Sequence, residues 1–517
     1  MSSESWIRFE GVRYDVRPGE RALEAMLRQG APVTFSCRKG TCRACMLQAE
    51  SGDPGAAAIA PLPEQYRALG FFLPCCADAV EAVEAVRADL SLCVEEALVA
   101  EAFRPAPDIL CLRLEPMRAL SWVPGQVIDL MNGAGESRPF SVVSAKDDYY
   151  LEVHIRVRSA GAVSAWAAGL GVGDSVRFRG PRGGLVWHES LADRPLLLVG
   201  TGTGGGVLAG IARHAVASGH RGRIRLFHGG RGADDLYLGP WLSALPKDRV
   251  EVVQAASREA VGDMHAARIT DLAFADGHDL ADTAVFLSGN PDMVETARIQ
   301  AVAAGAALDR IYADPFEPPV PYAPRDAQKL KVIEADPELW EALGEGATLT
   351  RILEEFYAAV YEDPLLAPFF HRVTKQRAIE KQYSFLQDLF HGTKLYFGEK
   401  PFNAHHWMVI SDEVFDHREA LFFGIVRRHG VPEPMIRRWA ALHEMFRREI
   451  VKPTPRGVLR EGMEVHLEGY SREVLDIGAV CDGCSGEVPP GSTVRMHVRT
   501  GEIFCAKCEG RDTTNAA

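Results

Sequence analysis

Two groups of cysteines in this chain have the spacing of metal ligands. The first has the pattern C-x4-C-x2-C followed about thirty residues later by two adjacent cysteines, and the second consists of two C-x2-C pairs. Clusters of this kind are typical of metal sites, whereas disulfides are rare in a chain kept under reducing conditions. The first group contains Cys37, Cys42, Cys45, Cys75 and Cys76. The second contains Cys481, Cys484, Cys505 and Cys508.

The first group predicts a [2Fe–2S] cluster. Its spacing is that of plant-type [2Fe–2S] ligation, and Gly40 lets the backbone approach the sulfide atoms closely. A zinc site is less favoured, because structural zinc rarely uses so tight a C-x4-C-x2-C run. Spacing alone leaves Cys75 and Cys76 open as the fourth ligand. The segment resembles plant-type ferredoxins, whose leucine–any–cysteine pattern ends on Cys75, and this resemblance selects that residue.

The second group predicts a zinc ribbon. Its two C-x2-C pairs flank about twenty residues that contain the strand-like run VRMHV and the turn TGEIF. Rubredoxin-like iron is the alternative. The metal would stabilise a piece of chain too small for a core of its own, and the module could also bind a protein partner.

Two adjacent histidines, His405 and His406, precede an apolar run in FNAHHWMVISDEVF. A buried histidine is usually a polar side chain that has found a hydrogen bond, but a neutral imidazole is also an iron ligand. Upstream, Tyr357 and Gln382 each lie on an apolar helical stripe, where a polar side chain costs free energy unless it has a partner. These two either pair with the backbone or with each other, or they face a bound ligand.

A glycine-rich turn, TGTGGG, follows the apolar run RPLLLVG and precedes VLAGIARHAV. A strand, a glycine turn and a helix N-terminus in this order suit the binding of a pyrophosphate. Gly202, Thr203 and Gly204 are therefore expected to contact a dinucleotide. The match to G-x-G-x-x-G leaves a Rossmann domain as the alternative interpretation.

The elements that must position these residues fall into several modules, because 517 residues exceed a single core. Alternating runs such as YLEVHIRV predict an antiparallel barrel, strands alternating with helices predict an α/β domain, and helical periodicity predicts an all-α module. The expected ranges are 1–92 for a β-grasp ferredoxin domain, 93–190 for the barrel, 191–316 for the α/β domain, 317–345 for a proline-rich linker, 346–455 for the all-α module and 474–512 for the zinc ribbon.

The charge and hydropathy of the chain argue against some binding partners and against a membrane-spanning segment. A net charge of −13 argues against a general nucleic-acid or anionic-membrane binder, which needs a basic surface. No apolar stretch approaches the length of a membrane span, and MSSESWIRFE is not a signal peptide. We therefore expect a cytoplasmic protein.

Residues 93–316 resemble the ferredoxin–NADP reductase superfamily. The resemblance rests on PGQ at 124–126, RPFS at 138–141, GAVS at 161–164, HGGRGADDLYL and SGNPDM. It implies that FAD is held by Arg138, Phe140, Ser141, Gly161, Ser164 and Phe316. It also implies that NAD(P)H is held by Gly202, Thr203, Gly204, Arg231, Asp235, Ser288 and Gly289. Ser288 stands where the family usually has cysteine, and the choice between NADH and NADPH stays open.

Residues 346–455 resemble a truncated (2/2) haemoglobin through FYAAVYEDPLLAPFF, KQYSFL, HGTKLYFG, AHHWMVIS and RHGVPEP. The resemblance implies a haem b whose proximal histidine precedes an isoleucine by five residues. Ile410 then selects His405, with His406 as the alternative. It also implies that Tyr357 and Gln382 hydrogen-bond bound dioxygen and that Phe370 packs on the haem.

Ferredoxin, flavin and nicotinamide modules in this order resemble the one-protein reductases of ring-hydroxylating dioxygenases, and a flavin reductase joined to a globin resembles a flavohaemoglobin. The resemblance implies that electrons pass from NAD(P)H through FAD and the [2Fe–2S] cluster to the haem, and that NO is oxidised by O2 to nitrate. Two alternatives stay open. One is a reductase for a separate oxygenase, with a globin that supplies or senses oxygen, and the other is a gas or redox sensor whose zinc ribbon contacts a partner.

Overall fold

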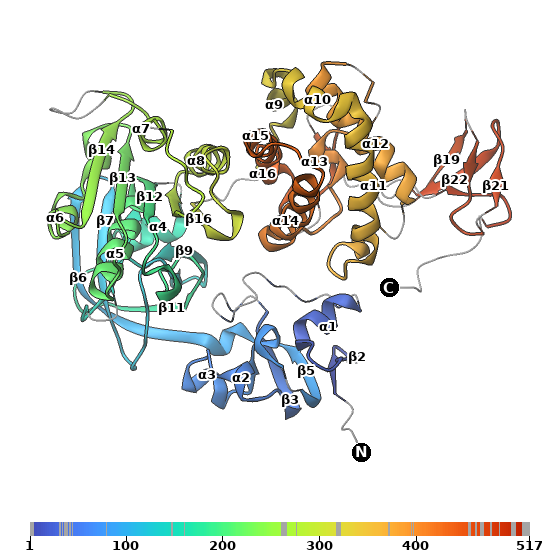
Figure 1. Ribbon diagram of the computed structural model, residues 1–517. Helices are drawn as coiled ribbons and strands as arrows, with labels where there is room; N and C mark the ends of the chain where they lie inside the picture. The colour runs from blue at the N-terminus through green and yellow to red at the C-terminus, as the bar shows by residue number, and fades with distance from the viewer. Residues whose placement is uncertain are drawn as a thin grey trace. The chain divides into compact units, whose positions relative to one another are not determined.

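The computed structural model divides the chain into two compact units, Met1–Pro321 and Tyr322–Ala517 (Figure 1). Among the residues that the structure describes, no helix is long and apolar enough to cross a membrane. These residues are 5–29, 31, 33, 35, 40, 43, 45–78, 80–145, 148–159, 161–259, 266–275, 277–316, 322–370, 373–393, 395–396, 398–452, 456–460, 463–465, 470–475, 478–484, 486–497 and 503–508.

The N-terminal part of the first unit is a five-stranded sheet in the order β2-β1-β5-β3-β4. Strand β1 pairs antiparallel with β2 and parallel with β5, which fits the predicted β-grasp fold. Leu23 and Met26 of helix α1 pack into a core with Phe9 and Phe71. The elements are β1 Trp6–Phe9, β2 Val12–Asp15, α1 Ala22–Arg28, β3 Leu47–Asp53, α2 Ala56–Ile59, α3 Glu64–Ala68, β4 Phe71–Phe72 and β5 Glu81–Arg87.

The next part is the predicted antiparallel barrel, a six-stranded sheet in the order β10-β7-β6-β11-β8-β9. A bridge between Val142 and Val153 joins its two edge strands, so the sheet closes on itself around Leu112, Ile128 and Phe178. The elements are β6 Val94–Ala106, β7 Ile109–Pro116, β8 Val127–Met131, β9 Ser137–Ser141, β10 Leu151–Arg156, α4 Ala162–Ala167 and β11 Ser175–Arg182.

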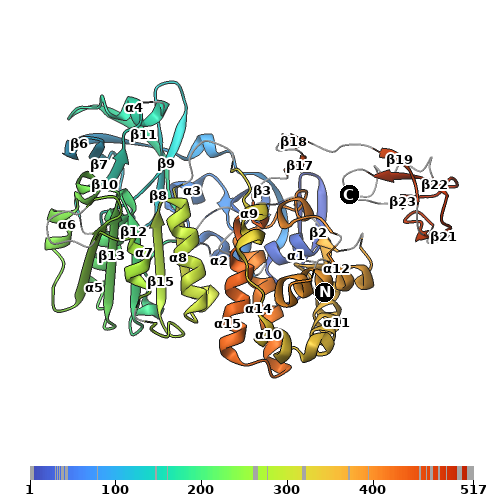
Figure 2. The same ribbon diagram turned by 90° about the horizontal axis from the view of Figure 1, so that it is seen from above.

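A five-stranded parallel sheet in the order β14-β13-β12-β15-β16 completes the first unit. Its central strands are continuous apolar runs because both faces are covered: α5 and α6 contact each other, as do α7 and α8, and the two pairs lie on opposite faces (Figure 2). The elements are β12 Leu196–Thr201, α5 Thr203–Ala217, β13 Ile224–Gly230, α6 Gly239–Ser243, β14 Val250–Ala256, α7 Ile269–Ala273, β15 Ala284–Gly289, α8 Pro291–Ala303 and β16 Ile311–Pro315.

The second unit begins with the predicted all-α module. Helix α11 packs against α12 and α14, and edge-to-face contacts of Phe422 with Phe356 and Trp439 fill the core at ring-centroid distances of 5.0 and 5.1 Å. The elements are α9 Asp326–Val332, α10 Pro337–Ala342, α11 Ala347–Glu362, α12 Lys375–His391, α13 Pro401–Ala404, α14 Asp412–Arg428, α15 Glu433–Glu444 and α16 Arg447–Ile450.

Helices α9 and α10 lie inside the segment 317–345 that was expected to be a linker. Asp336 caps α10 by accepting a hydrogen bond from the Leu339 amide at 3.0 Å, and Pro337 occupies the first turn, where its missing N–H costs nothing. The C-terminal part of this segment is therefore folded helix, while 317–321 lie outside the described residues.

Short strands finish the chain. They form two two-stranded sheets and one three-stranded sheet in the order β19-β22-β23. Val494 and Phe504 pack with Cys481 and Cys508 into a small core. The elements are β17 Val458–Arg460, β18 Met463–Val465, β19 Tyr470–Val474, β20 Ala479–Val480, β21 Glu487–Val488, β22 Thr493–His497 and β23 Ile503–Phe504.

Candidate functional site

Helices α11 and α12 bring Tyr357 and Gln382 together. The tyrosine hydroxyl donates a hydrogen bond to Gln382 Oε1 at 2.7 Å, and the Tyr357 side chain is only 7% exposed. The Phe370 ring meets the Tyr357 ring edge-on, with centroids 5.7 Å apart. Burial raises the pKa of Tyr357, so its hydroxyl stays protonated and remains a donor at neutral pH. The two polar side chains hydrogen-bond each other, which is one of the alternatives that the sequence left open, and the Phe370 ring lies beside them.

His405 follows helix α13 directly, and its Nδ1 lies 2.8 Å from the carbonyl oxygen of Pro401. A carbonyl only accepts, so Nδ1 carries the hydrogen and Nε2 keeps its lone pair. Burial lowers the pKa of His405 to about 4, which keeps the ring neutral at neutral pH. A neutral imidazole oriented through Nδ1 is the form that binds iron, so this donor set fits a haem.

His406 has the same kind of contact, with Nδ1 2.6 Å from the carbonyl oxygen of Asn403, and it is 7% exposed. The two histidines therefore share a tautomer, and these Nδ1 contacts do not distinguish them as iron ligands. The choice of His405 continues to rest on its spacing to Ile410 and stays a prediction.

A buried cluster of charges on α14 and α15 was not predicted from the sequence. Arg418 and His443 both contact the Glu419 carboxylate, at 2.9 Å for His443 Nδ1, and the Arg418 guanidinium lies 4.9 Å from the Phe356 ring centroid. Burial would raise the pKa of Glu419, but the charges of His443 and Arg418 outweigh it and lower that pKa to about 2. Nothing in the run DHREALFF distinguishes these charges from a solvated helix face.

The iron–sulfur loop is described only in part, because Cys37 and Cys42 lie outside the described residues. Cys45 and Cys75 are both buried, and a hydrogen bond with Cys45, together with burial, raises the pKa of Cys75. The Cys76 sulfur lies 3.8 Å from that of Cys75. Gly40 has φ 79°, and a Cβ there would lie 2.8 Å from the Cys76 sulfur, so only glycine fits.

The predicted flavin residues come from the barrel and the start of α4. Ser141 donates to Asp314 Oδ2 at 2.7 Å, Phe140 is half-buried against the barrel core, and the Arg138 side chain is exposed. Gly161 precedes α4, and Ser164 in its first turn hydrogen-bonds the Gly161 carbonyl at 3.1 Å. An exposed guanidinium is able to bind a flavin phosphate, and these assignments stay predictions.

The predicted nicotinamide residues meet at the carboxyl edge of the parallel sheet. A Cβ on Gly204 would lie 2.4 Å from the Ser288 carbonyl oxygen, so glycine is needed where α5 passes β15. Thr203 begins α5 and Gly202 precedes it at φ 55°. The Ser288 hydroxyl is fully buried and has no hydrogen-bond partner among the described residues. Because it is fully buried, no ligand atom reaches it in this conformation, so its contact with the nicotinamide stays a prediction.

The remaining predicted residues flank this edge. Gly289 has φ 121°, and its carbonyl oxygen accepts the Phe316 amide at 2.8 Å. The Arg231 amide donates to Asp235 Oδ2 at 2.7 Å, which holds the turn after β13 in shape.

Two residues at this edge were missed by sequence reasoning. Arg156 pairs with Asp235, and one of its nitrogens would lie 3.2 Å from a Cβ on Gly202. His228 is buried, and its Nε2 donates to the Gly202 carbonyl oxygen at 3.2 Å while Nδ1 accepts from Gln254. Burial lowers the pKa of His228 to about 4, so it acts as a neutral support of the glycine turn. His228 is the first residue of HGGRGADDLYL and Arg156 lies in YLEVHIRV, but neither pattern indicated that these side chains meet the glycine turn.

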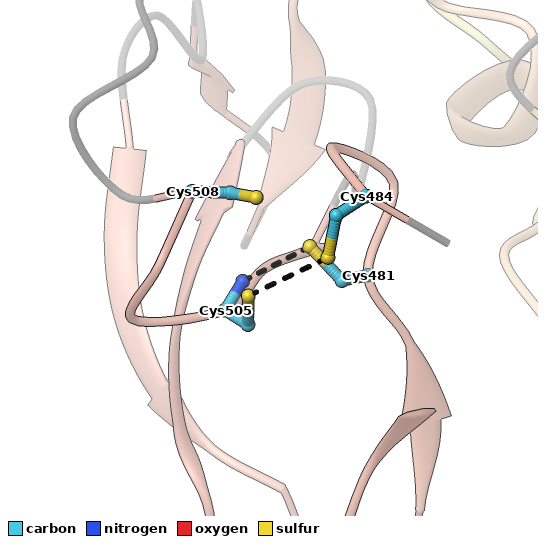
Figure 3. A group of neighbouring side chains, drawn as sticks. All are labelled: Cys481, Cys484, Cys505 and Cys508. Carbon is cyan, nitrogen blue, oxygen red and sulfur yellow. Dashed lines mark hydrogen bonds between the residues drawn. The ribbon is translucent and has the colours of Figure 1, made fainter. Parts of the chain in front are cut away.

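The four C-terminal cysteines converge from two loops (Figure 3). Their sulfur atoms all lie within 4.8 Å of one another, and those of Cys484 and Cys505 are 3.9 Å apart. Four sulfurs at 2.3 Å from a tetrahedral zinc would be about 3.8 Å apart. Burial would raise the pKa of Cys481, but backbone N–H groups, first that of Cys505, lower it to about 6, which favours the thiolate. The set fits a zinc ribbon.

Four family models match the chain in the predicted order. They are "2Fe-2S iron-sulfur cluster binding domain" at 7–80, "Oxidoreductase FAD-binding domain" at 101–187, "Oxidoreductase NAD-binding domain" at 198–298 and "Bacterial-like globin" at 338–438. The cofactors expected from the sequence are therefore supported: a [2Fe–2S] cluster, FAD, NAD(P)H and haem, with zinc fitting the four-cysteine site.

Curated relatives match part of the chain. The reductase subunit of an aromatic O-demethylase from Amycolatopsis sp. is 37% identical over 249 residues, which cover 44% of this chain and 72% of that protein. A second relative, from Ralstonia sp., is the ferredoxin–NAD(P)+ reductase component of naphthalene 1,2-dioxygenase/salicylate 5-hydroxylase systems. It is 30% identical over a match that covers 59% of this chain and 96% of that protein. Among solved structures, a cytochrome P450 reductase from Amycolatopsis matches at 30% identity and TM-score 0.43, covering 61% of this chain and 99% of that one.

Proposed function

Since this chain belongs to the family of ferredoxin–NAD(P)+ reductases with [2Fe–2S], FAD-binding and NAD-binding domains, and carries a bacterial-like globin after them, we propose that this globin is the reductase's own electron acceptor. In this proposal FAD and the [2Fe–2S] cluster would carry the electrons of NAD(P)H to haem b. The activity is the oxidation of nitric oxide by dioxygen to nitrate.

The reaction balances with one electron per nitrate. Each NAD(P)H supplies two electrons, so two NO and two O2 become two nitrate ions while NAD(P)+ and one proton are released. Haem b would supply an iron that binds dioxygen. In the proposal His405 holds that iron through Nε2, and Phe370 packs against the ring.

The hydrogen bond between Tyr357 and Gln382 carries this proposal. A haem iron would transfer negative charge to the dioxygen that it binds, and a nearby N–H or O–H donor of this chain would stabilise that charge. The tyrosine hydroxyl donates to Gln382 Oε1, which leaves the glutamine amide nitrogen turned away from that contact as an oriented donor. A purely structural core gains little from such a buried polar pair over apolar side chains of similar size.

The covalent fusion supports transfer within the chain. Joining donor and acceptor modules gives each an effective concentration in the millimolar range for a short linker. We further propose Cys37, Cys42, Cys45 and Cys75 as the cluster ligands and the four C-terminal cysteines as zinc ligands, in accord with the burial of Cys45 and Cys75 and with the sulfur separations.

The test is the yield of nitrate from NO under air with limiting NAD(P)H. We expect two nitrate ions per NAD(P)H oxidised for the intact protein. His405→Ala should make no nitrate but still reduce an artificial acceptor such as ferricyanide at the normal rate, because its reductase modules are unchanged. NAD(P)H oxidation without nitrate in the intact protein would refute the proposed activity.

The second candidate is a reductase that serves a separate oxygenase, with the globin supplying or sensing dioxygen. The two curated relatives favour it, since one is named as the reductase subunit of an aromatic O-demethylase and the other as the reductase component of dioxygenase and hydroxylase systems. In that case electrons reach a separate ferredoxin or oxygenase faster than they reach the haem. The ratio of these two rates in one preparation separates the candidates.

A further inference from the structure

Helix α13, which leads directly into His405, is bound by residues from outside the matched globin segment 338–438. On one side, the Phe402 amide donates to Asp326 Oδ2 at 3.0 Å, and this carboxylate is 5% exposed. Its other oxygen accepts the Ala327 amide at 2.8 Å, which fixes its orientation. Asp326 begins α9, in the segment that follows the reductase modules.

On the other side, Asn403 of α13 binds the backbone of Leu459 in β17. The Leu459 amide donates to Asn403 Oδ1 at 2.8 Å, and Asn403 Nδ2 donates to the Leu459 carbonyl at 3.2 Å. The Arg456 amide also donates to the His406 carbonyl at 2.8 Å. Strand β17 belongs to the segment that leads to the four-cysteine module.

A third contact is made to the backbone of His405 by Lys452. The side-chain Nζ of Lys452 donates to the His405 carbonyl oxygen at 2.6 Å, and its backbone amide donates to the Ile410 carbonyl oxygen at 2.9 Å. The neighbouring Glu449 is fully buried and binds Lys329 of α9 at 2.8 Å, so the two outer segments are also tied to each other. Together these contacts enclose α13 from both ends of the globin.

We propose that Asp326, Asn403 and Lys452 form a clamp of positioning residues that sets the orientation of His405 toward the haem iron. The inference rests on the proposed role of His405. It assigns Asp326 and Lys452, which lie outside the matched family segment 338–438, a role in the haem site.

The position of α13 and the orientation of the His405 ring are directly connected. The His405 imidazole is oriented by its hydrogen bond to the Pro401 carbonyl, one turn earlier in the same α13. A shift of α13 therefore moves the ring as well as the backbone. Partners that orient a metal ligand typically change metal affinity or activity 10- to 100-fold when they are removed.

The test measures the iron–histidine stretching band of the ferrous protein by resonance Raman spectroscopy, and the rate of haem loss to an excess of haem-free acceptor globin. Asp326→Ala and Asn403→Ala should each shift or broaden the band and raise the haem-loss rate about tenfold. Asp326→Asn keeps one acceptor oxygen but places an NH2 group against either the Phe402 or the Ala327 N–H, so it should give an intermediate band shift and haem-loss rate. Asp336→Ala removes the α10 cap and the ion pair to Arg438 but touches no residue of α13, so it serves as the matched control.

The outcomes separate the clamp from the proposed ligand. If His405→Ala keeps the iron–histidine band, both the ligand assignment and the clamp are wrong. If His405→Ala loses the band while Asp326→Ala and Asn403→Ala behave like Asp336→Ala, only the clamp is wrong. If Asp326→Ala does not fold, the comparison of Asn403→Ala with the control decides the question.

Discussion

The direction of the hydrogen bond between Tyr357 and Gln382 leads to a specific prediction about ligand binding. The hydroxyl donates to Gln382 Oε1 at 2.7 Å, so the donor left to face a haem ligand is the Gln382 amide, with Tyr357 as its support. Gln382→Leu removes the donor, whereas Tyr357→Phe removes only the support. The first change should therefore matter more than the second.

The expected magnitudes follow from typical hydrogen-bond energies. A hydrogen bond to a group carrying charge contributes about 1.5–3 kcal/mol, which corresponds to a roughly 10- to 150-fold faster dissociation of dioxygen in Gln382→Leu. A neutral hydrogen bond contributes about 1 kcal/mol, so Tyr357→Phe should accelerate dissociation about fivefold. The double variant should behave like Gln382→Leu alone, because the support has no effect without the donor. That corresponds to a coupling energy of about 1 kcal/mol, the whole effect of Tyr357→Phe.

The assay is stopped-flow replacement of dioxygen by carbon monoxide in the ferrous wild type, both single variants and the double variant. Thermal unfolding of each variant serves as the control for general loss of structure. A larger effect for Tyr357→Phe than for Gln382→Leu would mean that the hydroxyl is the direct donor, and the reasoning would be wrong. Effects that simply multiply in the double variant would also refute it.

Three further predictions concern other sites. Cys75→Ser should abolish the paramagnetic signal of the reduced [2Fe–2S] cluster while Cys76→Ser retains it, and the opposite result would exchange the ligands. The pKa of Glu419 is about 2, below its ordinary 4.5, so the stability that this carboxylate contributes is present above about pH 4.5 and is lost as the pH falls toward 2. Glu419→Gln should reduce the change in unfolding free energy between these pH values by roughly 3 kcal/mol, measured by urea unfolding. An unchanged dependence of the unfolding free energy on pH would contradict this prediction. Elemental analysis should find one zinc ion per chain in the wild type and none in Cys481→Ser, whose haem spectrum should be unchanged. Zinc retained in that variant would exclude the four-cysteine site.

Features encoded by local spacing could be predicted from the sequence. The two cysteine groups each lie within short segments, so their chemistry is visible in the spacing alone. The order of ferredoxin, flavin, nicotinamide and globin modules was likewise predicted and is confirmed by the four family models. The apolar stripes also placed Tyr357 and Gln382 on buried helix faces, and the structure adds that they meet.

Features that depend on distant partners could not be predicted. Asp326 and Leu459 reach α13 from segments 76 and 56 residues away in the chain, and no periodic pattern connects them. The polar partner of a buried group is chosen by tertiary packing, which is also why the cluster of Arg418, Glu419 and His443 was missed. The helix at Pro337–Ala342 is different, because an aspartate followed by proline was a readable helix start that the linker interpretation overlooked.

The central claim is that electrons from NAD(P)H reach the haem within one chain. Anaerobic stopped-flow mixing of the full-length protein with NAD(P)H tests this most directly, with flavin, cluster and haem followed at separate wavelengths. We predict that haem reduction follows flavin reduction with a first-order rate that is unchanged over a tenfold dilution of the protein. A haem that stays ferric while the flavin and cluster reduce, or a rate that falls in proportion to dilution, would contradict the account.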